Sequence, residues 1–191
     1  MAAKGDPTSD DPEVAHFRAI PWCATHLAAP GLTILPAFSR SVKPRFEDAL
    51  LSQTLKTHDT ISAFICFYPQ AQDDLANLPE VKAFVTFGNL ISGYPGISHG
   101  GIVATVLDET LSFISPGSRW RLHKQSAPEV VTAYLNTRYL RPVNVPGTYL
   151  VRVWLVRAEG RKTFVEGYIE NENGEKVAEA DALFVEVRQK L

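Results

Sequence analysis

Apolar and polar residues alternate along most of the second half of the chain, which is the pattern of half-buried β-strands. Residues 61–68 are rich in β-branched and aromatic side chains and predict the first strand, and residues 82–90 alternate in the same way. The pair Asn173–Gly174 predicts a tight hairpin near the C-terminus. Further strands are expected at 130–141, 148–157, 163–170 and 176–188.

One stretch between these strands follows a different pattern. Residues 102–113 are apolar on nearly every side up to Asp108 and Glu109, and a helix that is apolar all round is a buried helix. Ser98 can cap the first turn of this helix. We therefore predict an α+β fold in which an antiparallel sheet wraps around one long central helix.

The remaining N-terminal part, residues 1–59, is predicted to be an extension to a single domain at 60–191. Residues 1–15 are polar, acidic and contain proline, which predicts a disordered tail. Residues 22–35 are too often interrupted by proline and glycine for a long element. Apolar positions within 45–55 keep helical spacing, so a short amphipathic helix is expected there.

The composition is that of an ordinary soluble domain. The chain has 191 residues and a formal net charge of −2, which offers no general reason to expect nucleic acid or an anionic membrane as partner. No apolar run approaches the roughly 18 residues of a membrane span, and the acidic N-terminus lacks the apolar core of a signal peptide. Cys23 and Cys66 show neither metal-ligand spacing nor a disulfide framework, so we expect a reduced, cytoplasmic chain. The ending Gln189–Lys190–Leu191 only loosely matches a peroxisomal address, which makes that compartment the weaker alternative.

The candidate chemistry lies at the two ends of the predicted helix. Gly100 and Gly101 lack a Cβ, so a ligand can approach N–H groups at the positive end of the helix dipole, where a carbonyl oxygen would be polarised. Asp108 is a carboxylate at neutral pH and can deprotonate a water. Asp108 follows His99 by nine residues, which places the two about 13 Å apart along the axis and on opposite faces. A site that uses both ends therefore implies a homodimer with paired helices.

The sequence His99–Gly100–Gly101, followed by Leu107–Asp108–Glu109, resembles the hotdog-fold acyl-CoA thioesterases of the phenylacetate-pathway and mammalian THEM type. Residues 132–142, 159–165 and 179–184 continue the resemblance, which covers roughly residues 60–188.

The resemblance implies a hotdog fold and the hydrolysis of an acyl thioester of coenzyme A or of a carrier protein, without metal or redox cofactor, in a dimer or tetramer. Asp108 would be the base or nucleophile, the Gly100 N–H would hold the oxyanion, and Thr132 would place the attacking water. One departure is Gly93, which stands where some of these enzymes have an Asn or Gln six residues before the histidine.

Other candidate residues keep two interpretations. His99 can assist catalysis or serve as a hydrogen-bonded residue at the helix start. Arg138, Arg161 and Lys162 can bind the phosphates of coenzyme A, or they can be solvated charges near a hairpin. Glu109 is interpreted as a structural neighbour of Asp108.

Two alternative functions compete with thioester hydrolysis. Gly96-x-Ser98-x-Gly100 matches the nucleophile elbow of serine hydrolases. That fold needs alternating strands and helices and a histidine late in the chain, whereas the only later histidine is His123, in the predicted loop 116–128. A non-catalytic protein that binds acyl thioesters would keep the pocket without a base, and Asp108 argues against it.

Overall fold

A long antiparallel sheet forms the body of the molecule, as the alternating pattern predicts. The computed structural model describes residues 11–69, 80–114 and 130–187, and the predicted loop 116–128 lies outside them. Within the described residues the main sheet has seven strands in the order β1-β2-β3-β7-β8-β9-β6. Their bounds are β1 Leu32–Pro36, β2 Ile61–Pro69, β3 Val81–Phe87, β6 Val130–Tyr139, β7 Gly147–Glu159, β8 Lys162–Glu170 and β9 Lys176–Glu186.

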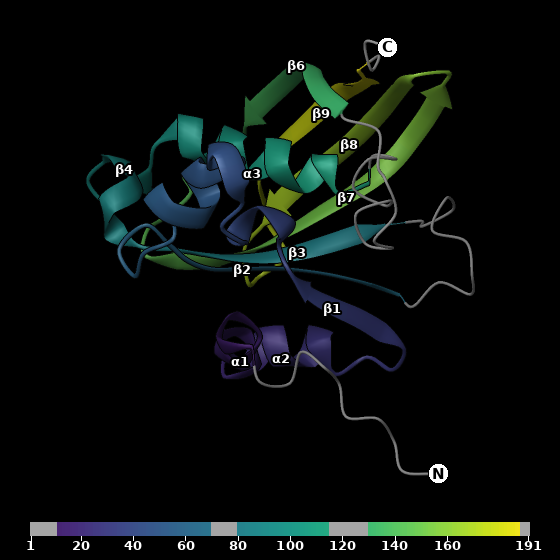
Figure 1. Ribbon diagram of the computed structural model, residues 1–191. Coiled ribbons are helices and arrows are strands. Elements are labelled where there is room, and N and C mark those ends of the chain that lie inside the picture. The colour runs from purple at the N-terminus through teal and green to yellow at the C-terminus, as the bar shows by residue number, and fades with distance from the viewer. Residues whose placement is uncertain (1–10, 70–79, 115–129, 188–191) are drawn as a thin grey trace.

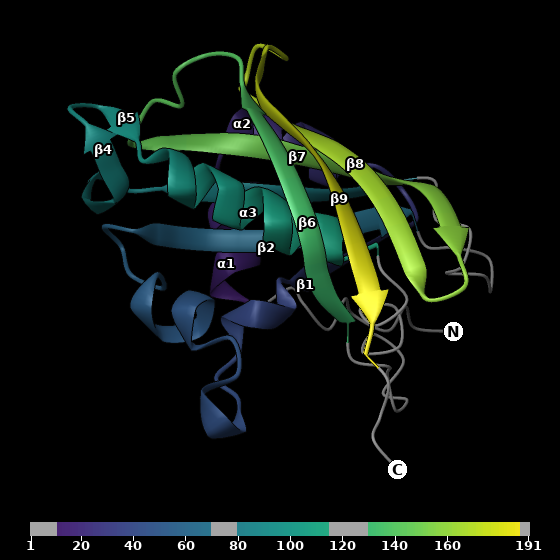
Figure 2. The ribbon, with the colours of Figure 1, turned by 90° about the horizontal axis from the view of Figure 1, so that it is seen from above.

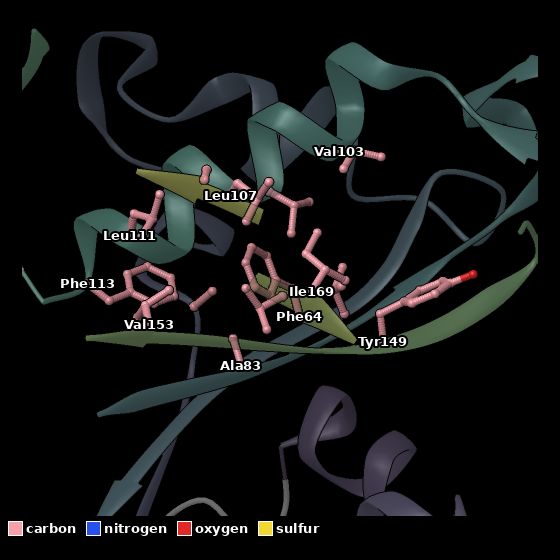
Figure 3. Packing of buried hydrophobic residues seen from close by; sticks show 14 of the residues in the cluster. Phe64, Ala83, Val103, Leu107, Leu111, Phe113, Tyr149, Val153 and Ile169 are labelled. Carbon is pink, nitrogen blue, oxygen red and sulfur yellow. The ribbon is translucent and has the colours of Figure 1, made fainter. Parts of the chain in front are cut away.

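The central helix α3, Gly100–Ser112, packs on the inner face of this sheet, and β6 and β9 cross over it (Figures 1 and 2). A Cβ at Gly167 on β8 would lie 3.2 Å from the Leu111 side chain and 2.6 Å from the Arg152 carbonyl oxygen, so glycine lets the helix approach closely. The α+β prediction is confirmed. Figure 3 shows the interface, in which Leu107, Leu111 and Phe113 face Phe64, Val153 and Ile169.

The opposite face of the sheet is partly covered by two helices, α1 (Pro12–Arg18) and α2 (Pro21–Leu27), as Figure 1 shows. Asp11 caps α1, since its carboxylate accepts the Glu13 N–H at 2.8 Å. Phe17 of α1 stacks on Phe84 of β3 with ring centroids 5.5 Å apart. The expected disorder is therefore wrong from Asp11 onward, because this polar stretch leads into an apolar helix face. None of the described helices is both long and apolar enough to span a membrane.

The segment between β1 and β2 turns repeatedly and does not form the helix predicted for 45–55. It contains the 3₁₀ turns η1 (Phe38–Arg40) and η2 (Pro44–Phe46) and the π-helical turn η3 (Leu50–Thr54). Arg45, Phe46 and Asp48 have φ values of 58°, 63° and 56°, which are incompatible with a continuous right-handed helix. Leu51 in η3 and Leu55 directly after it are buried in the core, whereas Leu50 is 52% exposed, so the expected apolar face of a helix is not formed.

A buried ion pair ties the N-terminal helices to this segment. Arg40 is 1% exposed and its Nε donates to both carboxylate oxygens of Glu13, at 3.1 and 3.3 Å. The guanidinium also donates to the carbonyl oxygens of Leu51 and Ile61, at 3.1 and 2.8 Å. Glu13 in turn accepts the N–H of Phe64 on β2 at 2.7 Å. One charge pair thus joins α1, η1, η3 and the sheet.

Candidate active site

His99 is the N-cap of α3, where Ser98 was expected. The His99 Nδ1 accepts the Gly101 N–H at 3.0 Å, and the His99 N–H donates to the Ile91 carbonyl oxygen at 2.7 Å. A Cβ at Gly101 would lie 3.0 Å from that Nδ1, so glycine allows the ring to lie across the first turn. Because Nδ1 is the acceptor, the proton of the neutral ring resides on Nε2. The ring therefore offers an N–H donor on its outer side.

The helix start leaves one glycine N–H for a ligand. The first N–H groups of a helix have no intrahelical partner, and that of Gly101 is used by His99. The Tyr139 hydroxyl donates to the Gly100 carbonyl oxygen at 3.0 Å, and its ring lies against Gly100. The hydrogen bond holds the peptide that carries the Gly101 N–H, and the ring contact holds Gly100 itself, whose own N–H lies at the positive end of the dipole.

The absence of a polar side chain at Gly93 has a steric reason. Gly93 is in the short strand β4 (Ser92–Tyr94), which pairs with β5 (Ile97–Ser98) just before the helix. A Cβ at Gly93 would lie 2.9 Å from the Cα of His99. The chain therefore has no room there for the Asn or Gln that the resembling enzymes place six residues before the histidine.

The other end of α3 carries the carboxylate. The Thr132 hydroxyl on β6 donates to Asp108 Oδ1 at 2.9 Å, so the structure brings together two residues that are 24 positions apart. Burial raises the pKa of the Asp108 carboxyl, and the hydrogen bond from Thr132 opposes that shift. Both residues line a pocket of about 160 Å³. The other lining residues are Phe38, Asp48, Glu109, Ser112, Phe113, Val130 and Phe184.

Glu109 is a second acid in this pocket. Burial raises the pKa of its carboxyl to about 7, and the nearby Ser39 hydroxyl acts in the opposite direction. The negative charges of Asp48 and Asp108 raise this pKa further, whereas Lys43, which pairs with Asp48, lowers it. Asp108 and Glu109 thus differ in environment: burial raises the pKa of Glu109 to about 7, and the Thr132 hydroxyl donates to Asp108 at 2.9 Å.

Comparison with known proteins identifies the family of the segment that carries both helix ends. Residues 95–178 match the family model described as thioesterase superfamily. This segment is similar to the thioesterase superfamily. The acyl-coenzyme A thioesterase THEM4 of Rattus norvegicus is 32% identical over 98 residues, which cover 51% of this chain and 39% of THEM4. The chain therefore matches well under half the length of that relative.

Two solved structures share the fold. A variant of a hypothetical thioesterase from Streptococcus pneumoniae has a TM-score of 0.50 and 17% identity, over 58% of this chain and 84% of that one. The PaaI protein of E. coli, from the phenylacetic acid degradation operon, has a TM-score of 0.50 and 13% identity, over 57% of this chain and 73% of that one. The predicted hotdog fold is confirmed.

The basic residues near the superfamily segment lie apart from the Asp108 pocket. Arg138 pairs with Glu179 at 2.9 Å, and the register of β6 on β9 places both on the sheet face away from α3. Arg161 donates to the Glu186 carbonyl oxygen at 3.1 Å, in the turn between β7 and β8. Lys162 is the exposed first residue of β8. These three side chains do not meet Asp108 within one chain.

Ser98, the candidate nucleophile of a serine hydrolase, is 7% exposed in β5 of the thioesterase-superfamily segment. Its hydroxyl donates to the His99 carbonyl oxygen at 3.4 Å. An activated serine needs an exposed oxygen that is hydrogen-bonded to a base. The geometry of Ser98 therefore does not support that alternative.

Sequence reasoning missed the part of the site that comes from the N-terminal region. Phe38, in η1, and Asp48, between η2 and η3, line the pocket, although they lie 70 and 60 residues before Asp108 in the sequence. Neither residue stands in a motif or at a spacing that signals a site. Only the folding of this segment over the C-terminal end of α3 brings them there.

The Thr132 hydroxyl is expected to set the pH dependence of turnover. It stabilises the charged form of Asp108, so Thr132→Val removes that effect and raises the pKa of Asp108 further. Because Asp108 must be ionised to accept a proton, the acid limb of kcat/KM should move to higher pH. The loss of one hydrogen bond predicts a fall of about tenfold in kcat/KM at neutral pH.

The pH profile of kcat/KM for the wild type and the variant measures this effect. Thr137→Val, on the same strand but outside the pocket, is the matched control and should keep both rate and profile. An unchanged acid limb in Thr132→Val would contradict the role assigned to the hydroxyl.

Proposed function

We propose that this protein hydrolyses acyl thioesters of coenzyme A, or of a carrier protein, by base-assisted attack of water. The observation that carries the proposal is the Asp108–Thr132 hydrogen bond at 2.9 Å inside a partly apolar pocket. The match of residues 95–178 to the thioesterase superfamily supports it, as does the similarity to a relative named an acyl-coenzyme A thioesterase.

The reaction requires a base on one side of the thioester carbonyl and a hydrogen-bond donor to its oxygen on the other. Asp108 accepts a proton from a water held by Thr132, and the water oxygen bonds to the carbonyl carbon. The developing oxyanion accepts a hydrogen bond from the Gly100 N–H. When the carbon–sulfur bond breaks, the thiolate leaves and takes up a proton, and the products are a carboxylic acid and a free thiol. Attack by Asp108 itself through a transient anhydride gives the same products.

We propose that the working unit is a homodimer in which the two groups come from different chains. Gly100 and Asp108 are eight residues apart on one straight helix, about 12 Å along its axis, so one chain cannot direct both at one carbonyl. A two-fold axis reverses the direction of the partner helix, which brings its N-terminal end alongside the C-terminal end of the first.

The edge strand β6 is the surface that suits this pairing. β6 has ten residues at the edge of the main sheet, and no strand of the described residues pairs with it on its outer side. Val131, Tyr134 and Tyr139 on this strand are 53%, 38% and 56% exposed. A long edge strand with exposed apolar side chains is typical of a strand that pairs with a second copy.

Complementation between two inactive variants is the expected result of a shared site. Gly100→Pro removes the N–H, and proline suits the first helical position after His99, whose φ of −62° and ψ of 131° are extended. Alone it should lower kcat by about 10²–10³-fold. When Gly100→Pro and Asp108→Asn chains are unfolded together and refolded in equal amounts, random pairing should restore about a quarter of wild-type activity. No recovery, with heterodimers present by mass, would contradict the shared site.

Release of free thiol from acyl-CoA substrates tests the proposed reaction directly. The purified protein should release thiol in proportion to enzyme, and Asp108→Asn should not. Saturable acyl-CoA binding without thiol release would instead indicate a binding protein.

We propose that the protein is cytoplasmic, because Cys23 and Cys66 are free and buried, which suits a reducing compartment.

A further inference from the structure

Phe38 lines both the Asp108 pocket and a second, larger hollow. The pocket of about 160 Å³ holds Asp108 and Thr132, and Phe38 forms part of its apolar wall. The second hollow, of about 510 Å³, is lined by Leu35, Pro36, Phe38, Ser41, Lys43 and Glu47. Phe38 is the lining residue that the two share.

An ion pair also links residues that line the two hollows. Lys43 lines the larger hollow, Asp48 lines the Asp108 pocket, and the two side chains pair with each other. The Phe38 ring also contacts Phe113 edge-on, with centroids 5.9 Å apart. The ring therefore closes the apolar side of the pocket between the η1 turn and the end of α3.

The turn that carries Phe38 is firmly anchored. The N–H of Ala37 donates to the Phe64 carbonyl oxygen of β2 at 3.1 Å, and Arg40, two residues after Phe38, is the buried centre of the ion pair described above. Lys56 donates to the Arg40 carbonyl oxygen at 2.8 Å. Hydrogen bonds of Ala37 and Arg40 thus fix the backbone before and after Phe38. The Phe38 ring therefore has a defined position in the pocket wall.

The volume on the Asp108 side indicates the size of acyl group that fits. A cavity of roughly 150 Å³ accommodates a benzene ring, whereas sites for larger ligands span about 300–1,000 Å³. One part of the lining is apolar, made by Phe38, Phe113, Val130 and Phe184, and suits a small apolar group, whereas Asp48, Glu109 and Ser112 line the part around the carboxylate and hydroxyl. A compact acyl group fits this space, and a long chain would need the hollow beyond Phe38.

We propose that Phe38 is the specificity-determining end wall of the acyl site and restricts the enzyme to compact acyl groups, up to about the size of one aromatic ring. This inference rests on the thioester hydrolysis proposed above. It makes the segment before the thioesterase-superfamily match a part of the site rather than a cover for the sheet.

Substitution of Phe38 is the test. The values of kcat/KM are measured for butanoyl-, hexanoyl-, benzoyl-, decanoyl- and palmitoyl-CoA. The wild type should prefer the first three. Phe38→Ala joins the two hollows and should raise the ratio of kcat/KM for decanoyl-CoA to that for butanoyl-CoA by at least about tenfold, because even one methylene in an apolar pocket changes kcat/KM by that factor. Phe38→Leu, a milder change, should move the ratio in the same direction by less.

Phe46→Ala is the matched control, because Phe46 is 83% exposed on the same segment and lines neither hollow. It should keep the wild-type preference. An active wild type that prefers palmitoyl-CoA, or folded Phe38 variants with an unchanged ratio, would overturn the inference and leave the proposed hydrolysis intact. A wild type that hydrolyses none of the five would overturn both.

Discussion

The Asp108→Asn variant is expected to keep its fold and lose about 10²–10⁴-fold in kcat toward acyl-CoA substrates. The amide has the shape of the carboxylate, and its oxygen can still accept the Thr132 hydroxyl, whose bond to Oδ1 is 2.9 Å. It cannot take up a proton from water. The loss therefore falls on kcat, while KM changes little. Thiol release under saturating substrate measures it.

The stability of the same variant provides an independent check. Burial raises the pKa of Asp108 above its value in the unfolded chain, so ionisation is penalised in the folded state. The protein therefore loses stability as the pH rises from the unfolded-state pKa of Asp108 through its folded-state pKa. Asparagine carries no charge, so at neutral pH Asp108→Asn should be at least as stable as the wild type. Urea unfolding at pH 7 measures the difference.

Asp59→Asn is the matched control, since Asp59 is exposed and its side chain contacts only the neighbouring His58 among the hydrogen bonds of the described residues. It should retain wild-type turnover. Wild-type turnover in folded Asp108→Asn would show that another group activates the water, and Glu109, in the same pocket, would be the next to test.

Breaking the buried ion pair should give the largest loss of stability. Arg40→Met leaves the buried Glu13 carboxylate with the partly exposed Lys56 ammonium, at 3.2 Å, as its remaining charged partner. It also removes the donors to the Leu51 and Ile61 carbonyl oxygens. Loss of one partner of a buried pair costs about 3–5 kcal/mol in the free energy of unfolding. Urea unfolding at fixed protein concentration measures this, because a dimer's apparent stability depends on concentration.

Two further variants separate the charge from the packing. Arg40→Met combined with Glu13→Gln also removes the buried negative charge that has lost its buried partner, and should recover part of the loss. Arg157→Met, which breaks an exposed pair with Glu159 at 2.7 Å, should cost no more than about 1 kcal/mol. An equal small cost for Arg40→Met would contradict the role of the pair as the link between α1 and the sheet.

The sequence predicted the strands and the helix whose burial is visible in the spacing of their own apolar residues. The alternation in β7, β8 and β9 and the continuous apolar run in α3 each report burial within a single element, so strands and helix were found within a few residues of their ends. The short strand β1 was missed because its five residues, which end at Pro36, are too few to show an alternation of apolar and polar side chains. The positive φ values at Arg45, Phe46 and Asp48 likewise have no signature in the spacing of apolar side chains.

The sequence by itself determined the α+β class of fold, the central helix and the two candidate groups at its ends, because these depend on periodicity and on residues close together in the chain. The hotdog fold was expected from the resemblance of its motifs to a known family. The tertiary structure decided that Thr132 bonds Asp108, that His99 uses the Gly101 N–H, and that Phe38 closes the pocket. These contacts join residues on separate elements or depend on how a ring is oriented. Their physical basis is the packing of the N-terminal segment and the edge strand over one helix, which no local pattern encodes.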